Sequence, residues 1–211
     1  MSRNYYKEPL GKGHLGNSRI PGDASVEVKE MVKREIVEQA QAAGLLNRDV
    51  ANLLAIADHE SGFNPDAACK TSTASGVMES LDPSVEDAYE RLSKYPKIID
   101  GYKIKTQREN YRRFDYRANI DVGIAIYLDK KRMARSSDVG KIYKKYNPKA
   151  NVKLQQKLRN LSRHYLLSLT ETKKPGKEAN IPRWGTGGGQ KTTPSASLHD
   201  RSRVKRVWNV E

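Results

Sequence analysis

The stretch His59-Glu60-Ser61-Gly62-Phe63-Asn64-Pro65 marks the point where a strongly helical run ends and a polar loop begins. The apolar run 47–58 predicts a buried helix with Asn47 as its N-cap, and Gly62 predicts its end. Glu60 is therefore expected on the last turn of a buried element. Because burial disfavours a charged carboxylate, the sequence predicts a raised pKa for Glu60, which suits a general acid. A helical glutamate that merely sits in solvent is the alternative interpretation.

Three blocks of residues, in order along the chain, form a larger pattern. The first is Glu60-Ser61-Gly62-Phe63-Asn64-Pro65-Asp66-Ala67, followed by Ala74-Ser75-Gly76-Val77-Met78. The second is Asn119-Ile120-x-x-Gly123-x-x-x-Tyr127-Leu128, and the third is Tyr146-Asn147. The pattern, which covers roughly residues 47–150, resembles the soluble lytic transglycosylase family. Three departures are visible: Glu79 stands where the family has Gln, one extra residue lies between Ala67 and Gly76, and Pro148-Lys149 replaces the glycine that usually follows Tyr-Asn.

The resemblance implies a mainly α, lysozyme-like α+β fold. It also implies an enzyme that cleaves the bond between N-acetylmuramic acid (MurNAc) and N-acetylglucosamine (GlcNAc) in peptidoglycan glycan strands without consuming water. Glu60 would be the catalytic acid and then the base, oriented by Ser61. The substrate-binding residues implied by the resemblance are Ser61, Gly76, Met78, Glu79, Tyr146 and Asn147. No cofactor and no metal are expected.

Length and composition favour one catalytic domain with two extensions. The 211 residues, 36% of them hydrophobic, suit a single modest core. We expect an extended, Gly- and Pro-rich N-terminal arm over residues 1–24, the helical domain over residues 25–170, and a basic Gly/Pro/Ser-rich tail over residues 171–211.

Five further helices are expected within the domain. They are an amphipathic helix over 25–43, a short helix that Asp82 caps, a core helix over 119–133, and two last helices that Ser137 and Asn151 cap. Asp100-Gly101 lies between short β-prone runs and predicts a β-hairpin over 98–104. Tyrosines at helical spacing are usually core residues, and this is the interpretation for Tyr143 and Tyr165.

Net charge, cysteine content and the absence of apolar runs bear on partners and compartment. The net charge of +14 favours an anionic partner such as cell-wall polymer, nucleic acid or anionic lipid. Cys69 is the only cysteine, which argues against a disulfide framework. The N-terminus lacks the apolar core of a secretory signal, and no run approaches the roughly 20 apolar residues of a membrane span.

These observations lead to a prediction about delivery. Peptidoglycan lies across a membrane from the cytoplasm, so we expect the protein to be made in a host cytoplasm and carried in a phage virion. It would open the cell wall in the periplasm for tail passage or genome ejection. Both arms would bind other virion proteins.

Several alternatives remain open at this point. A structural virion protein with a degenerate lysozyme-like cleft is favoured by Glu79 and by the missing glycine. A hydrolytic lysozyme would need a second carboxylate, for which the candidates are Asp66, Glu79 and Asp82. A DNA-binding protein is a third class.

Two motif resemblances are rejected, and one basic run is left as a minor candidate. His59-Glu60 lacks the second histidine of a zinc-protease helix, because Phe63 stands in its place. Residues 185–192 lack the second glycine of a phosphate-binding loop, because Gln190 occupies its position. The basic run 201–206 is interpreted as solvated, with an acidic partner or nucleic acid as the minority interpretation.

Overall fold

A computed structural model of the protein describes residues 4–171, and it confirms the mainly helical fold. The elements, in chain order, are η1 (Tyr5–Lys7), α1 (Val26–Ala42), α2 (Asn47–Glu60), α3 (Asp82–Asp87), η2 (Ala88–Leu92), η3 (Pro96–Ile99), η4 (Arg108–Asn110), α4 (Tyr116–Ala134), α5 (Val139–Tyr146) and α6 (Val152–Glu171). Over this range no sheet forms, and the β-type pairing consists of isolated bridges from Ser75 to Ala68 and to Ser80. None of the described helices is long and apolar enough to cross a membrane.

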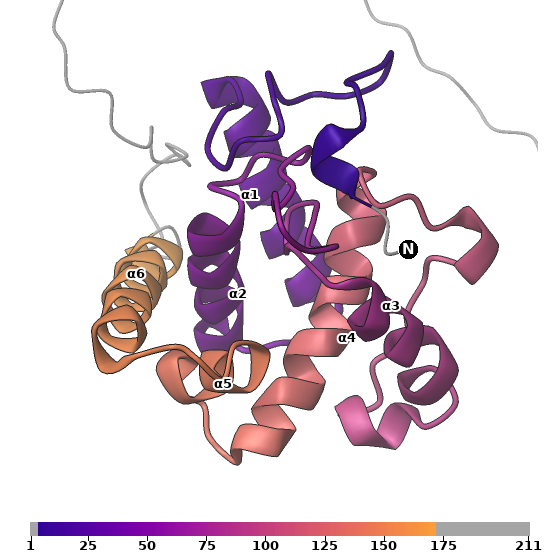
Figure 1. Cartoon of the computed structure of the whole chain (residues 1–211). Helices are drawn as coiled ribbons and strands as arrows, with labels where there is room; N and C mark the ends of the chain where they lie inside the picture. Colours follow the sequence, from indigo (N-terminus) through magenta and orange to yellow (C-terminus); the bar gives the residue numbers. More distant parts are fainter. Residues whose placement is uncertain (1–3, 172–211) are drawn as a thin grey trace, which may run out of the picture. The chain divides into compact units, whose positions relative to one another are not determined.

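Helix α2 forms the centre of the domain. Every residue from 49 to 57 is buried, and α6 runs alongside it (Figure 1). The two helices are joined by polar contacts as well as apolar packing, because Ser162 donates to Asn52 and Tyr165 donates to Asp58, each at 2.7 Å. The helix begins at Asn47 itself, with Leu46 in the N-cap position, so the predicted Asn47 cap is wrong by one residue.

Helix α4 packs against the same core from the other side. Asp115 caps it by accepting the amides of Arg117 and Ala118, which explains why it starts three residues before the predicted Asn119. The Tyr127 hydroxyl donates to Asp49 on α2 at 2.7 Å. This buried polar contact fixes how α4 lies against α2, because a buried hydroxyl or carboxylate without a partner would be costly.

The last two helices follow the predicted pattern with one change of cap. Asp138, and not Ser137, caps α5, because its carboxylate accepts the Lys141 amide at 2.9 Å. Asn151 caps α6 as predicted, accepting the Leu154 amide at 2.9 Å.

The predicted β-hairpin over 98–104 is wrong. Pro96 opens a 3-10 turn there, and Asp100 adopts a left-handed conformation with φ of 54°. The amides of Gly101 and Tyr102 then bond back to the carbonyls of Pro96 and Ile99, so the Asp-Gly pair ends a turn of helix instead of joining two strands. Ile99 is fully buried, and the Tyr102 hydroxyl donates to Asp121 on α4 at 2.5 Å, so tertiary contacts override the local hairpin signal.

The segment 4–24, expected as part of an extended arm, lies against the domain. The amides of Leu15 and Gly16 donate to the Asp66 carboxylate at 2.7 and 2.6 Å. The Arg19 guanidinium lies 3.8 Å from the centre of the Phe114 ring. The segment is irregular, as its glycines and prolines predict, but its backbone is held by the domain. The predictions for residues 172–211 lie outside the described residues.

Candidate active site

Glu60 is the last residue of α2, and the turn that follows it is sharp. The Ser61 amide donates to the Ala57 carbonyl, and the Ser61 hydroxyl donates to the same carbonyl at 3.0 Å. Gly62 and Phe63 then take positive φ values of 55° and 60°. Ser61 is fully buried and lies at the end of the helix. Because its hydroxyl donates to the Ala57 carbonyl, Ser61 stabilises the turn beside Glu60 and does not donate to Glu60 itself.

The hydroxyl of Tyr143, on α5, donates to Oε1 of Glu60 at 2.6 Å. The Tyr143 side chain is buried, and its ring meets the His59 ring edge to face, with centroids 5.5 Å apart. Burial raises the pKa of Glu60, and the hydrogen bond from Tyr143 offsets part of that rise because it favours the charged form. Glu60 is thus a desolvated carboxyl group held in one orientation by a phenol.

Glu79 is the second carboxyl group at this site. Burial and the neighbouring Glu60 raise the pKa of Glu79 to about 8, and a hydrogen bond links the two carboxyl groups. Two carboxyl groups in contact cannot both be charged at low cost, so the pair retains a proton at neutral pH. Glu79 has a positive φ of 39°, a conformation that a non-glycine residue adopts only when its surroundings hold it there.

Helix α4 holds the loop that carries Glu79. The Asn119 side chain accepts the Met78 amide at 2.9 Å and donates to the Ser75 carbonyl at 3.4 Å. A Cβ on Gly76 would lie 2.4 Å from the Asn119 amide nitrogen, and a Cβ on Gly123 would lie 2.5 Å from Met78 Cγ. Glycine is therefore needed at both positions, and the 119–128 block of sequence serves to position the 74–79 block.

These contacts bear on two of the residues expected to bind substrate. Met78 is 4% exposed and packs on Gly123, and Gly76 is also buried. Both residues pack against α4. The residue of this loop that lies against Glu60 is Glu79, which follows Met78.

Tyr146 and Asn147 lie at the end of α5, close to the Tyr143–Glu60 pair. The rings of Tyr143 and Tyr146 are stacked with centroids 6.1 Å apart. The Tyr146 hydroxyl is buried, and within residues 4–171 it has no hydrogen-bond partner. Asn147 is exposed, and its amide donates to the Tyr143 carbonyl at 2.8 Å.

The sequence predicts Tyr143 as a core residue. Its ring is buried, but its hydroxyl lies at the site and donates to Glu60. One signal in the sequence points to it. Tyr143 and Tyr146 are three residues apart on one short helix, and residues at that spacing share a helical face.

The other candidate carboxylates are engaged elsewhere. Asp66 is fully buried and bound to the amides of the N-terminal segment. Asp82 accepts hydrogen bonds from Tyr5 and Arg113. Of the three residues expected as a second carboxylate, Glu79 is the one that the structure places against Glu60. Among residues 4–171, no three His, Cys, Asp or Glu side chains are grouped so that they could hold a metal ion.

Comparison with known proteins identifies a family for most of this region. The family model described as "Transglycosylase SLT domain" matches residues 38–164, which includes Glu60, Glu79 and Tyr143. Searches of the curated proteins and of the solved structures found no significant match to the chain.

Proposed function

Because the chain belongs to the transglycosylase SLT family, we propose that it cleaves the MurNAc–GlcNAc bond of peptidoglycan by transglycosylation, with Glu60 as the acid and then the base. The observation that carries this assignment is the hydrogen bond from Tyr143 to Glu60 at the half-buried end of α2. A carboxyl group with a raised pKa and a fixed orientation is what proton donation to a glycosidic oxygen requires.

The reaction needs two proton transfers, and one carboxyl group serves both. Protonated Glu60 gives its proton to the glycosidic oxygen as the bond from that oxygen to C1 of MurNAc breaks, and GlcNAc leaves with a free 4-hydroxyl. The Glu60 carboxylate then takes the proton of the MurNAc 6-hydroxyl, whose oxygen bonds to C1. The product carries a 1,6-anhydro ring, Glu60 is protonated again, and no water is consumed.

Two neighbours support Glu60 in this cycle. The Tyr143 hydroxyl donates to Glu60 and so stabilises the carboxylate formed after the first transfer. Glu79, whose pKa is raised to about 8, keeps its proton near neutral pH, and its hydrogen bond to Glu60 favours the carboxylate form of Glu60, as the bond from Tyr143 does. Glu79 in place of the family's Gln is therefore compatible with an active acid.

The experiment that tests this function is mass analysis of digested peptidoglycan. Fragments that carry 1,6-anhydro ends are lighter by one water than hydrolysed fragments, and these are the expected products. A digest with reducing ends only would instead assign the protein as a hydrolase with Glu79 as the second carboxylate.

The setting proposed for this activity is a phage virion, in which the enzyme opens the host wall for tail passage or genome ejection. The N-terminal segment is bound to its own domain, so we assign docking to other virion proteins to residues 171–211, which are rich in Lys and Arg and lie outside the family match. Deletion of 172–211 should leave wall cleavage by the free protein intact and remove it from assembled particles. Packaging of the truncated protein at full occupancy would contradict this role.

A further inference from the structure

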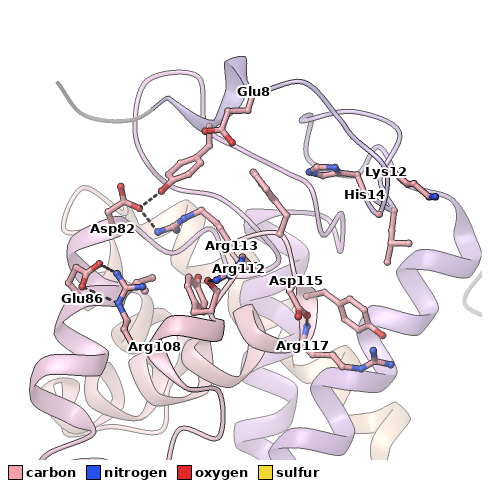
Figure 2. A pocket seen from close by; sticks show the side chains of 17 residues that line it. Glu8, Lys12, His14, Asp82, Glu86, Arg108, Arg112, Arg113, Asp115 and Arg117 are labelled. Atoms are coloured by element: carbon pink, nitrogen blue, oxygen red, sulfur yellow. Dashed lines mark hydrogen bonds and ion pairs between the residues drawn. The ribbon is translucent and has the colours of Figure 1, made fainter.

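A pocket of about 980 Å³ lies between the N-terminal segment and residues 108–117, and Glu60 is not among the residues that line it. Figure 2 shows Glu8, Lys12 and His14 on one side of it, and Arg108, Arg112, Arg113 and Arg117 on the other. The volume is at the upper end of the range typical of ligand sites in proteins. The pocket therefore has room for a ligand that the proposed reaction at Glu60 does not account for.

The acidic residues in the pocket already have partners. Asp82 accepts from Tyr5 and Arg113, and Glu86 pairs with Arg108. Asp115 accepts the first amides of α4, and Glu8 lies near Arg19. The carboxylates of the pocket are thus engaged in holding its walls.

Lys12 and Arg112 differ from the other basic residues of the pocket in their partners. Arg112 donates to the carbonyls of Glu109 and Tyr111 at 2.7 and 3.0 Å, and within residues 4–171 neither Arg112 nor Lys12 has a carboxylate partner. Both side chains are exposed. They are the cations of this pocket that can receive an anionic group of a ligand.

Aromatic rings make up much of the remaining wall. Tyr5, Tyr111, Phe114 and Tyr116 line the pocket, and the Tyr5 and Phe114 rings meet edge to face at 6.1 Å. A ligand that fits such a wall combines carboxylates with aliphatic carbon. A polyphosphate fits less well, because four carboxylates also line the pocket and would repel a densely charged anion.

The pocket and the loop that carries Glu79 share a wall. Arg113 donates to the Ser80 carbonyl, one residue beyond Glu79. The Tyr111 hydroxyl accepts from Asn119 at 3.3 Å, and Asn119 in turn holds the Met78 amide. A ligand bound in the pocket therefore lies directly behind the loop that faces Glu60.

We propose that this pocket binds the peptide stem of peptidoglycan, with Lys12 and Arg112, on opposite sides of the pocket, each able to receive a stem carboxylate. The proposal rests on the proposed function for its choice of polymer. In peptidoglycan the glycan strand is uncharged, because the lactyl acid of MurNAc is joined to the peptide as an amide, so the carboxylates are on the stem. The stem also carries amino groups, for which the acidic residues of the pocket are acceptable neighbours.

The test is a titration of the full chain with a synthetic tetrapeptide of the wall stem, in which calorimetry measures the binding. Binding to the wild-type protein is expected, with a loss of about tenfold or more in Lys12→Ala and in the double variant Lys12→Ala/Arg112→Gln. Lys94→Ala removes an exposed cation outside the pocket and should bind as the wild type does. Thermal melting of each variant checks that it is folded.

Three results would overturn the proposal: no binding of the tetrapeptide to the wild type, binding that both pocket variants retain, or a preference of Lys12 and Arg112 for inorganic phosphate or duplex DNA over the peptide. Glu60→Gln should bind the tetrapeptide normally. If the peptide binds at these residues while peptidoglycan is not cleaved, the stem site stands and the proposed reaction fails, so the two proposals are separable.

Discussion

Gly62, two residues after Glu60, and Gly22, in the N-terminal segment, are in backbone contact: a Cβ on Gly62 would lie 2.7 Å from the Cα of Gly22. The Gly22 amide also donates to the Ser61 carbonyl at 2.7 Å. Two parts of the chain that are 40 residues apart thus meet at main-chain distance beside Glu60.

This contact predicts unequal costs for two glycine substitutions. Gly62→Ala places a methyl group against backbone and strains a positive φ, so it should cost about 2–5 kcal/mol of stability. Gly22→Ala has the positive φ of 79° but no atom within 4 Å of the new methyl group, so it should cost only about 1–2 kcal/mol. Denaturant unfolding of both variants measures the difference, and equal costs would mean that the two backbones are not in contact.

Glu60→Gln removes the transferable proton and keeps the shape of the side chain. Cleavage of peptidoglycan should fall by at least ~10²–10⁴, the range typical of general acid–base catalysis. The circular dichroism spectrum should match that of the wild type. A variant with normal activity would show that another group supplies the proton.

Tyr143→Phe removes the hydroxyl that donates to Glu60 and leaves the ring in place. Because that hydrogen bond lowers the pKa of Glu60, its loss should raise the pKa further and move the alkaline limb of the pH–activity profile to higher pH. The maximal rate should fall, because the carboxylate formed in the reaction loses its donor.

Tyr146→Phe is the matched control for Tyr143→Phe. It removes a buried hydroxyl that has no partner among the described residues, so stability should be unchanged or rise by about 1 kcal/mol. If Tyr146→Phe shifts the pH profile and Tyr143→Phe does not, the roles of the two tyrosines are reversed.

Glu79→Gln should change how stability depends on pH. The pKa of Glu79 is raised to about 8 in the folded protein, against 4.5 as its ordinary value, so the folded state holds a proton that the unfolded state releases between these values. Stability from this group is present below about pH 4.5 and is lost as pH rises toward about 8. In Glu79→Gln that loss, on the order of a few kcal/mol, should disappear. Melting temperatures at pH 5 and pH 8 measure it, and parallel curves for the two proteins would contradict the shared proton.

Much of the helical frame could be predicted because it depends on local signals. Gly62 ends α2 where the sequence indicates, and Asn151 caps α6, since both act within one turn of helix. The hairpin over 98–104 could not be excluded locally, because Asp100-Gly101 suits a turn at the end of a helix as well as one between strands. Contacts of Ile99 and Tyr102 with the core decide between these outcomes.

At the candidate site, too, local signals could be predicted and tertiary contacts could not. Glu60 could be placed from its own helix, whereas the partner that contacts it is 83 residues away and depends on how α5 packs. The closeness of Glu79 to Glu60 depends on Asn119 and Gly123, which hold the loop from a third helix. Asp66 was a candidate for chemistry, and its structural use could not be seen without the fold of the N-terminal segment.

The contacts of Asp66 have a practical consequence for dissecting the chain. A fragment cut at the limits of the family match, 38–164, would lack Leu15, Gly16 and Arg19, and so would leave this buried carboxylate without its donors. It would also lose Val32 and Ile36, both fully buried in the first helix, and Tyr165, which donates to Asp58. The smallest autonomous unit is therefore wider than the region that the family model matches, and expression trials should retain residues 4–171.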